Sequence, residues 1–226
     1  MIIGVHEPET NQKAKSSLYS RRNILWAIFH HRLLFNVMLV SALIQIGNFS
    51  IQPLLSLYVS ELSHTEEVAL LAGITFSAAG LGNIFFARFW GHLSDQVGYE
   101  KVLKYLLIAC VIFIVPQAFV TDLWQLMLLR FFYGIVSGGL IPITAALIRR
   151  DTPIEVQGEI MGYNQSFRFL GNILGPVLGG FIAGFGGIHS VFYTTGLLFL
   201  VSVSIYYVIS RLPKQYMEDL LRSHVN

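Results

Sequence analysis

Residues 33–59 read LLFNVMLVSALIQIGNFSIQPLLSLYV and contain no Asp, Glu, Lys or Arg. A helix crosses a bilayer with about 20 mostly apolar residues, so this stretch is long enough to cross one. Similar stretches follow at residues 68–87, 105–121, 123–148, 160–183 and 189–210. Because lipid offers no partners to backbone amides, we expect an all-α membrane protein with six transmembrane helices.

The composition supports the same class of protein. The chain has 226 residues, of which 54% are hydrophobic and 12% are charged. Soluble domains carry roughly 25% charged residues, so this composition excludes a disordered protein, a nucleic-acid partner and a typical cytosolic enzyme. The net charge of +2 is too small to indicate a polyanionic partner. The single cysteine, Cys110, excludes a disulfide framework within this chain.

If the six stretches cross the membrane in turn, the positive charges outside them all lie on one side. They are Lys13, Lys15, Arg21, Arg22, Arg32, Arg88, Lys101, Lys104, Arg149, Arg150, Arg211, Lys214 and Arg222. Cytoplasmic loops are enriched in Lys and Arg, so we expect a multi-pass protein of the plasma (inner) membrane with both termini in the cytoplasm. This divides the chain into a cytoplasmic linker (1–32), a six-helix transmembrane bundle (33–210) and a cytoplasmic tail (211–226).

The linker ends in an amphipathic lead-in at residues 18–32. Its apolar side is expected to hold Leu18, Leu25, Ile28 and Phe29, among the basic residues Arg21, Arg22 and Arg32. A helix of this kind can lie in the membrane–water interface. The alternative is a basic flank that only fixes the orientation of the first crossing.

The first crossing carries a polar stripe. Helical spacing places Ser41, Gln45, Asn48, Gln52 and Ser56 on one side, at steps of four and three residues. Amide side chains are costly against lipid, so we expect Gln45, Asn48 and Gln52 to line a substrate cavity. The alternative is hydrogen bonding between helices.

Two arginines lie inside the fourth and fifth crossings. Arg130 is seven residues in from Leu123, and Arg168 shares a face with Asn164. Burying an arginine in hydrocarbon costs at least about 2.5–3.5 kcal/mol, which favours a functional role for Arg130, Asn164 and Arg168 in the cavity. For Arg130, the alternative is a side chain that snorkels to the outer interface.

Glycines at four-residue spacing predict close helix contacts in the same two crossings. The residues of this packing motif are Gly134, Gly138, Gly171, Gly175, Pro176, Gly179 and Gly180. Pro176 removes a backbone donor and is expected to bend its helix. No crossing contains Asp or Glu. A titrating acid for proton coupling would therefore lie on another polypeptide or on a missing part.

The sequence shows no pattern typical of an enzyme. It contains no apparent nucleophile–base pair or phosphate loop, and His30 and His31 lack the spacing of metal ligands on one helix face. We therefore expect no catalytic residues, no bound metal and no cofactor.

Three motifs resemble those of the major facilitator superfamily. Residues 91–101, GHLSDQVGYEK, resemble its GxLxDRxGxxK signature, with Gln96 in place of the usual basic residue. Residues 126–134 resemble LxxxRxxxG, and residues 171–180 match the GxxxGPxxGG motif of drug:proton antiporters. The resemblance implies one half of the superfamily's twelve-helix fold, and the linker and the altered first signature favour the C-terminal half.

The resemblance also implies roles for particular residues. The first and fourth helices of a half line the central cavity, which would place the polar stripe and Arg130 against the substrate. Gly91, Asp95, Gly98 and Lys101 would form a gating loop, with Asp95 near the start of the fifth helix. The glycines of the fifth helix would lie where the two halves meet.

The function implied is multidrug efflux by proton antiport, with a lipophilic small molecule as the substrate and a second six-helix half as a partner. That half would be a second copy or another chain. Two alternatives stay open: a facilitator of a sugar or other small metabolite, and an inactive truncated product or non-transporting membrane protein.

Overall fold

The computed structural model describes residues 21–63 and 67–210, and within these ranges it contains helices but no strand. The helices are α2 (Arg21–His30), α3 (Arg32–Ile51), η1 (Gln52–Leu54), α4 (Leu55–Ser63), α5 (Val68–Val97), α6 (Tyr99–Ile114), η2 (Val115–Phe119), α7 (Leu123–Ser137), α8 (Leu140–Arg150) and α9 (Gln157–Ser210). The predictions made for the start of the linker and for the tail lie outside the described residues.

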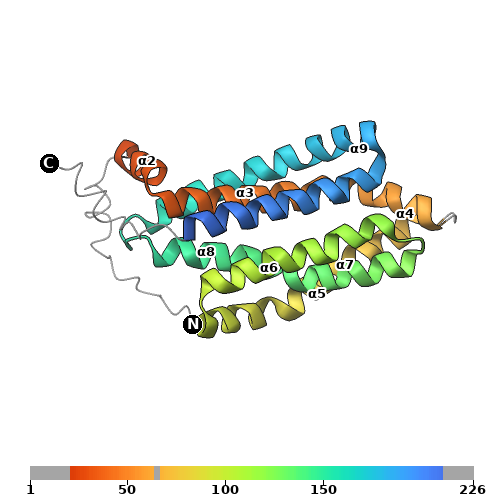
Figure 1. Ribbon diagram of the computed structural model, residues 1–226, viewed down its shortest axis with the longest axis horizontal. Coiled ribbons are helices and arrows are strands. Elements are labelled where there is room, and N and C mark those ends of the chain that lie inside the picture. Colours follow the sequence, from red (N-terminus) through yellow and green to blue (C-terminus); the bar gives the residue numbers. More distant parts are fainter. Residues whose placement is uncertain (1–20, 64–66, 211–226) are drawn as a thin grey trace, which may run out of the picture.

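These helices form six crossings, as the sequence predicts. The first crossing runs through α3, η1 and α4, the third through α6 and η2, and the fourth through α7 and α8. The helix α9 supplies the last two, because Gly187 has a positive φ of 76° that reverses its direction. Figure 1 shows α9 running along the bundle, turning and returning beside α3. The fold class predicted from the sequence is confirmed.

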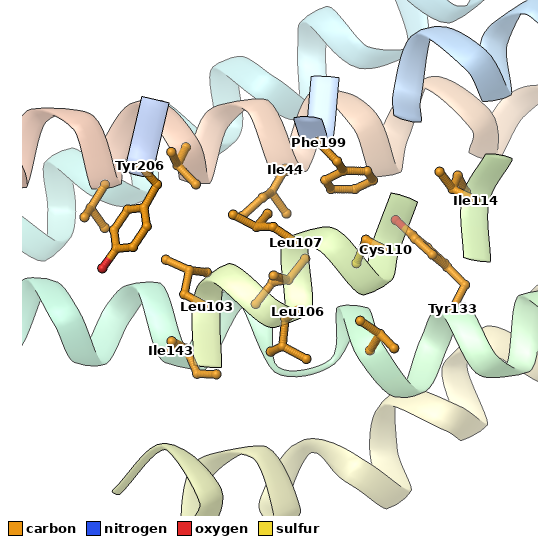
Figure 2. Packing of buried hydrophobic residues seen from close by; sticks show 14 of the residues in the cluster. Ile44, Leu103, Leu106, Leu107, Cys110, Ile114, Tyr133, Ile143, Phe199 and Tyr206 are labelled. Atoms are coloured by element: carbon orange, nitrogen blue, oxygen red, sulfur yellow. The ribbon is translucent and has the colours of Figure 1, made fainter. Parts of the chain in front are cut away.

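The core of the bundle lies where α3, α6, α8 and the returning part of α9 meet. Figure 2 shows these side chains facing one another, among them Ile44, Leu103, Leu106, Leu107, Ile143, Phe199 and Tyr206. Lipid tails are as apolar as leucine, so helix association in a membrane depends on close packing more than on removal of water. The dense cluster supplies that packing.

The helix α2 packs against α3 and differs from the expected lead-in. Ile24, Ala27 and Ile28 are buried, whereas Leu25 and Phe29 are exposed. Ile28 therefore does not share a side with Leu25 and Phe29, because the position of α3 selects which part of the helix is covered. Leu18 lies outside the described residues.

Candidate functional site

Glycines join the first part of α9 to α3. A Cβ atom built on Gly171 would lie 2.5 Å from the carbonyl oxygen of Ala42, and one on Gly179 would lie 2.1 Å from that of Ser50. Between them, a Cβ atom on Gly175 would lie 2.8 Å from Cβ of Phe49. No side chain fits in this space, so the glycines set how near the two backbones approach. This face thus packs inside the bundle, where the resemblance had implied a contact between halves.

A second set of glycines joins α7 to α5. A Cβ atom on Gly134 would lie 2.0 Å from the carbonyl oxygen of Ala79, and one on Gly138 would lie 2.9 Å from Oδ1 of Asn83. On α5, a Cβ atom built on Gly82 would lie 2.4 Å from the carbonyl oxygen of Phe131. Gly82 was not predicted as a packing residue, because the residues four positions away, Ala78 and Phe86, do not form a pair of glycines with it.

Two residues of the predicted packing motif lie outside these contacts. A Cβ atom on Gly180 would meet nothing within 4 Å, so Gly180 is open rather than packed. One helical step rotates a residue by about 100°, which turns Gly180 away from α3 while Gly179 faces it. Pro176 lies half-buried inside α9.

The predicted polar stripe of α3 divides into a buried and an open part. Ser41 and Gln45 are buried. The amide of Gln45 donates to Oδ1 of Asn172 in α9 over 2.9 Å, which is the helix-to-helix bond of the alternative interpretation. Gln52 and Ser56 lie on the open side and are exposed.

Asn48 stands at the boundary between these two parts. It is half-buried, and its Oδ1 accepts a hydrogen bond from the Tyr133 hydroxyl of α7. Because Tyr133 is almost wholly buried, it fixes the Asn48 side chain from inside the bundle. Tyr133 was not singled out from the sequence, although it lies three residues after Arg130 and so on the same helix face.

The guanidinium of Arg130 lies inside the bundle. The residue is only 5% exposed, and its Nε and Nη2 atoms have no hydrogen-bond partner among the described residues. The guanidinium carbon lies 6.0 Å from the centroid of the Phe192 ring. An arginine that snorkels would be exposed, so the structure does not have the alternative arrangement.

Asn164 and Arg168 occupy one face of α9, as the spacing predicts. Asn164 is buried, and its Oδ1 has no partner among the described residues. Arg168 is half-buried and donates from Nη1 to Oε1 of Gln165 over 2.9 Å. Within the described part of the chain, no hydrogen bond joins Asn164 or Arg168 to the α3 stripe. The six predicted cavity residues therefore do not form one cluster in this conformation.

The connection between α5 and α6 contains the predicted gating loop. Gly98 adopts a φ of 101°, which allows the sharp turn between the two helices. The carboxylate of Asp95 accepts a hydrogen bond from the Tyr99 hydroxyl. Its partner is thus in the adjoining turn of α6 rather than at the start of the fifth crossing. Gly91 and Lys101 flank the turn, and Lys101 is exposed.

An ion-pair cluster fastens this loop to the end of α8. Arg150 contacts Oε1 of Glu100 at 2.7 Å and Oδ1 of Asp151 at 2.9 Å. Beside it, a cavity of about 610 Å³ is lined by Tyr99, Pro142, Ala145, Ala146, Arg149 and Arg150. The basic charges place Lys101 and Arg150 on the same side of the membrane, but no pattern in the sequence pairs Glu100 with Arg150.

Comparison with known proteins agrees with this architecture. The sequence profile of the Major Facilitator Superfamily matches residues 19–220. The chain belongs to the major facilitator superfamily. The match covers all six crossings and includes α2.

Two relatives within the superfamily match along nearly the whole chain. The Uncharacterized MFS-type transporter YuxJ of Bacillus subtilis is 46% identical over 215 residues, which cover 95% of this chain and 55% of YuxJ. The Multidrug resistance protein MdtG of Serratia proteamaculans is 33% identical over 98% of this chain and 54% of MdtG. The chain therefore spans about half the length of the curated relatives it matches.

Solved structures show the same half-fold at low sequence identity. A bacterial homolog of the human lysosomal transporter Spinster, in an inward-facing and occupied conformation, has a TM-score of 0.72 at 16% identity. The match covers 85% of this chain and 47% of that chain. The D-xylose-proton symporter has a TM-score of 0.64 at 18% identity, over 84% of this chain and 48% of that chain. At these identities, the likeness concerns the fold alone.

Proposed function

We propose that this chain is the C-terminal half of a multidrug efflux transporter that exchanges lipophilic compounds for protons. The observation that carries the proposal is the match to proteins named multidrug resistance protein MdtG, at 33% identity over 98% of this chain. The composition supports it, since 13% aromatic residues and few embedded charges suit lipophilic substrates.

The proposed partner is a second six-helix half, supplied by another copy or another chain. Relatives nearly twice as long are consistent with a missing half of similar size. The crossing α5 supports this, because only 11% of its most apolar window is buried within the bundle. Its exposed side chains include Ile84 and Phe85, each at least 70% exposed. We propose that part of this face contacts the second half and that the rest faces lipid.

The proposed moving body is the six-helix bundle itself. The glycine contacts of α3 with α9 and of α5 with α7 are backbone-to-backbone, so these pairs cannot slide without steric conflict. A change of conformation would then be a rotation of the whole half against its partner. Asp95, held by Tyr99 at one end of the bundle, would act on this rotation as the gate.

The proposed substrate surface begins at Asn48 and Gln52 of α3. Gln52 is exposed, and the bond from Tyr133 leaves the amide nitrogen of Asn48 available to a ligand. The buried Nε and Nη2 atoms of Arg130 have no hydrogen-bond partner in the described part of the chain, an arrangement that costs free energy. A conformation that brings substrate or the second half to Arg130 would recover this cost. The described crossings hold no Asp or Glu within their apolar stretches, so we assign the titrating acid to the second half.

Dye accumulation in a drug-sensitive bacterial host tests the proposal. The chain is expressed alone and together with the part of YuxJ that lies outside the 215 matched residues, and efflux of a lipophilic cationic dye is measured. We expect lower dye accumulation in at least one of these cells. Unchanged accumulation in both would overturn the proposal and favour a non-transporting membrane protein.

Two variants then separate the proposed roles. Arg130→Ala should abolish efflux while insertion is retained, whereas the exposed arginine variant Arg149→Ala serves as the matched control and should transport normally. Asp95→Asn should lower the turnover of dye more than its apparent affinity. Equal losses of both would contradict a gating role for Asp95.

A further inference from the structure

The helix α2 has two apolar faces, of which the bundle covers one. Ile24, Ala27 and Ile28 are each at most 2% exposed, and α2 packs against α3. A surface helix of a soluble protein would turn polar residues to the other side. The uncovered side of α2 needs a different explanation.

The more exposed face consists of Arg22, Leu25, Trp26 and Phe29, which we call the outer face of α2, and the Trp26 ring stacks on that of His30 with 3.8 Å between centroids. Helical spacing places these four residues within about 100° of one another. Phe29 is 58% exposed, and Leu25 and Trp26 are each more than one third exposed. A short helix that exposes an aromatic pair and a leucine beside an arginine has the composition of a helix in a membrane interface.

The position of α2 brings this face to the edge of the bilayer. Only His31 separates α2 from the membrane-crossing helix α3. The Phe29 ring lies 5.4 Å from the Phe35 ring of α3, and the Phe35 ring lies 6.1 Å from the Phe167 ring of α9. A row of aromatic rings therefore continues from α2 to the sides of two crossings.

The charges around α2 complement an anionic lipid surface. Arg22 and Arg32 are exposed on either side of the helix. The sequence contains no acidic residue between Thr10 and Glu61. Figure 1 shows α2 at the same end of the bundle as the α5–α6 and α8–α9 connections, beside which lie the exposed residues Lys101 and Arg149. Arg150 lies at this end too, but it is paired with Glu100 and Asp151. Positive charge of this kind attracts anionic headgroups.

We propose that α2 lies in the membrane–water interface, with its outer face inserted between the headgroups and upper acyl chains of an anionic bilayer. The helix is then an anchor that fixes the entry of α3 and the depth of the bundle at this end. The proposal is independent of the proposed transport, because it concerns a contact with lipid that the bundle makes with or without a second half.

Tryptophan fluorescence tests this placement, because the chain contains three tryptophans. The full chain is reconstituted in phosphatidylglycerol–phosphatidylcholine vesicles as a variant that keeps Trp26 alone (Trp90→Phe with Trp124→Phe). Quenching is compared between lipids brominated near the top and near the end of the acyl chain. Trp90 alone is the matched control, since its half-buried indole is held by a hydrogen bond to the carbonyl oxygen of Ile135 over 2.6 Å.

We expect the upper bromines to quench Trp26 by at least about twofold more than the lower ones, as for a helix at the headgroup boundary. Replacing Leu25 and Phe29 with serine should at least halve this quenching. If the Trp26-only variant does not fold, the difference between the natural chain and Trp26→Phe gives the same signal. Aqueous iodide quenching of Trp26 that vesicles do not reduce would overturn the proposal. Protection of Trp26 from both bromine and iodide would overturn it as well, because a protein would then cover the face.

Discussion

The crossing formed by α3 to α4 and the crossing formed by α5 have the same mean hydropathy, 1.7 for the most apolar window of each. Yet 61% of the first window is buried inside the bundle, compared with 11% of the second. Both segments are therefore equally suited to the apolar interior of the bilayer. The difference lies in their neighbours: α3 contacts α8 and both parts of α9, whereas α5 packs mainly against α7 along one narrow glycine contact.

This contrast shows that the hydropathy of a segment indicates whether it can lie in the membrane, but not how much of it is buried against other helices. A leucine gains no advantage from leaving lipid for the protein interior, because both are apolar. What distinguishes the buried crossing is the shape of its contact surface. Substitutions that change the shape of the contact surface should therefore affect stability differently in α3 and α5. Substitutions that change only apolarity should affect the two helices alike.

The largest expected effect comes from a side chain placed in the α3 contact. In Gly179→Leu, the Cβ atom would meet the Ser50 backbone, which cannot rotate away. We expect a loss of about 3 kcal/mol or more in the free energy of unfolding, or failure to fold. Gly80→Leu on the open side of α5 is the control and should stay within about 0.5 kcal/mol. Thermal unfolding and size-exclusion profiles in detergent give the comparison, and similar profiles for both variants would contradict it.

A smaller effect is expected when packed atoms are removed. Ile44 of α3 is 1% exposed and Ile84 of α5 is 75% exposed. We expect Ile44→Ala to lower the free energy of unfolding by about 2 kcal/mol, because it leaves a cavity in the cluster of Figure 2. Ile84→Ala should change it by less than about 0.5 kcal/mol in the isolated half. Unfolding in a mixed-micelle denaturant series measures both values. Equal losses would show that apolarity, rather than packing, determines stability.

The hydrogen bond between Gln45 and Asn172 provides a third test. A double-mutant cycle with Gln45→Leu, Asn172→Leu and the double variant should give a coupling energy of about 0.6 kcal/mol, the average for such bonds in a membrane protein. The same cycle with Gln52→Leu in place of Gln45→Leu is the control, and its coupling should be near zero because Gln52 is exposed. Coupling at Gln52 of the same size would mean that the stripe acts as one unit.

The smallest effect is expected at the ends of the helices. Arg150→Ala removes the contacts with Glu100 and Asp151 and should cost about 0.5 kcal/mol, because partly exposed ion pairs contribute little. Arg149→Ala should cost less, since no ion pair of Arg149 is present in the described part of the chain. High salt should reduce the difference between the two variants in thermal unfolding. A difference that persists in high salt would indicate a packing role for Arg150.

The sequence indicated which glycines share a helix face, but not which helix that face contacts. Four-residue steps place Gly171, Gly175 and Gly179 on one face, which follows from helix geometry alone. That this face meets α3 depends on how six helices arrange themselves. Gly180 was included in the same motif, and the structure shows it open because it is turned by one helical step.

The polar residues show the same limit. Spacing placed Gln45 and Gln52 on one stripe, but α9 covers only the first of them. A place for Arg130 in the cavity was expected from the cost of burying an arginine in hydrocarbon. That its Nε and Nη2 atoms have no hydrogen-bond partner among the described residues, and that it lies beside Phe192, was not expected. The pairing of Asn48 with Tyr133 joins residues far apart in the chain, so no local pattern indicates it.

By itself, the sequence determined that this chain crosses a membrane six times as helices. The free energy of moving a segment into hydrocarbon is a sum over its residues, so it can be estimated from the sequence alone. Only the tertiary structure decided which faces are buried and which polar groups find partners. Lipid and protein interior are equally apolar, and close approach of two backbones depends on residues brought together from distant helices.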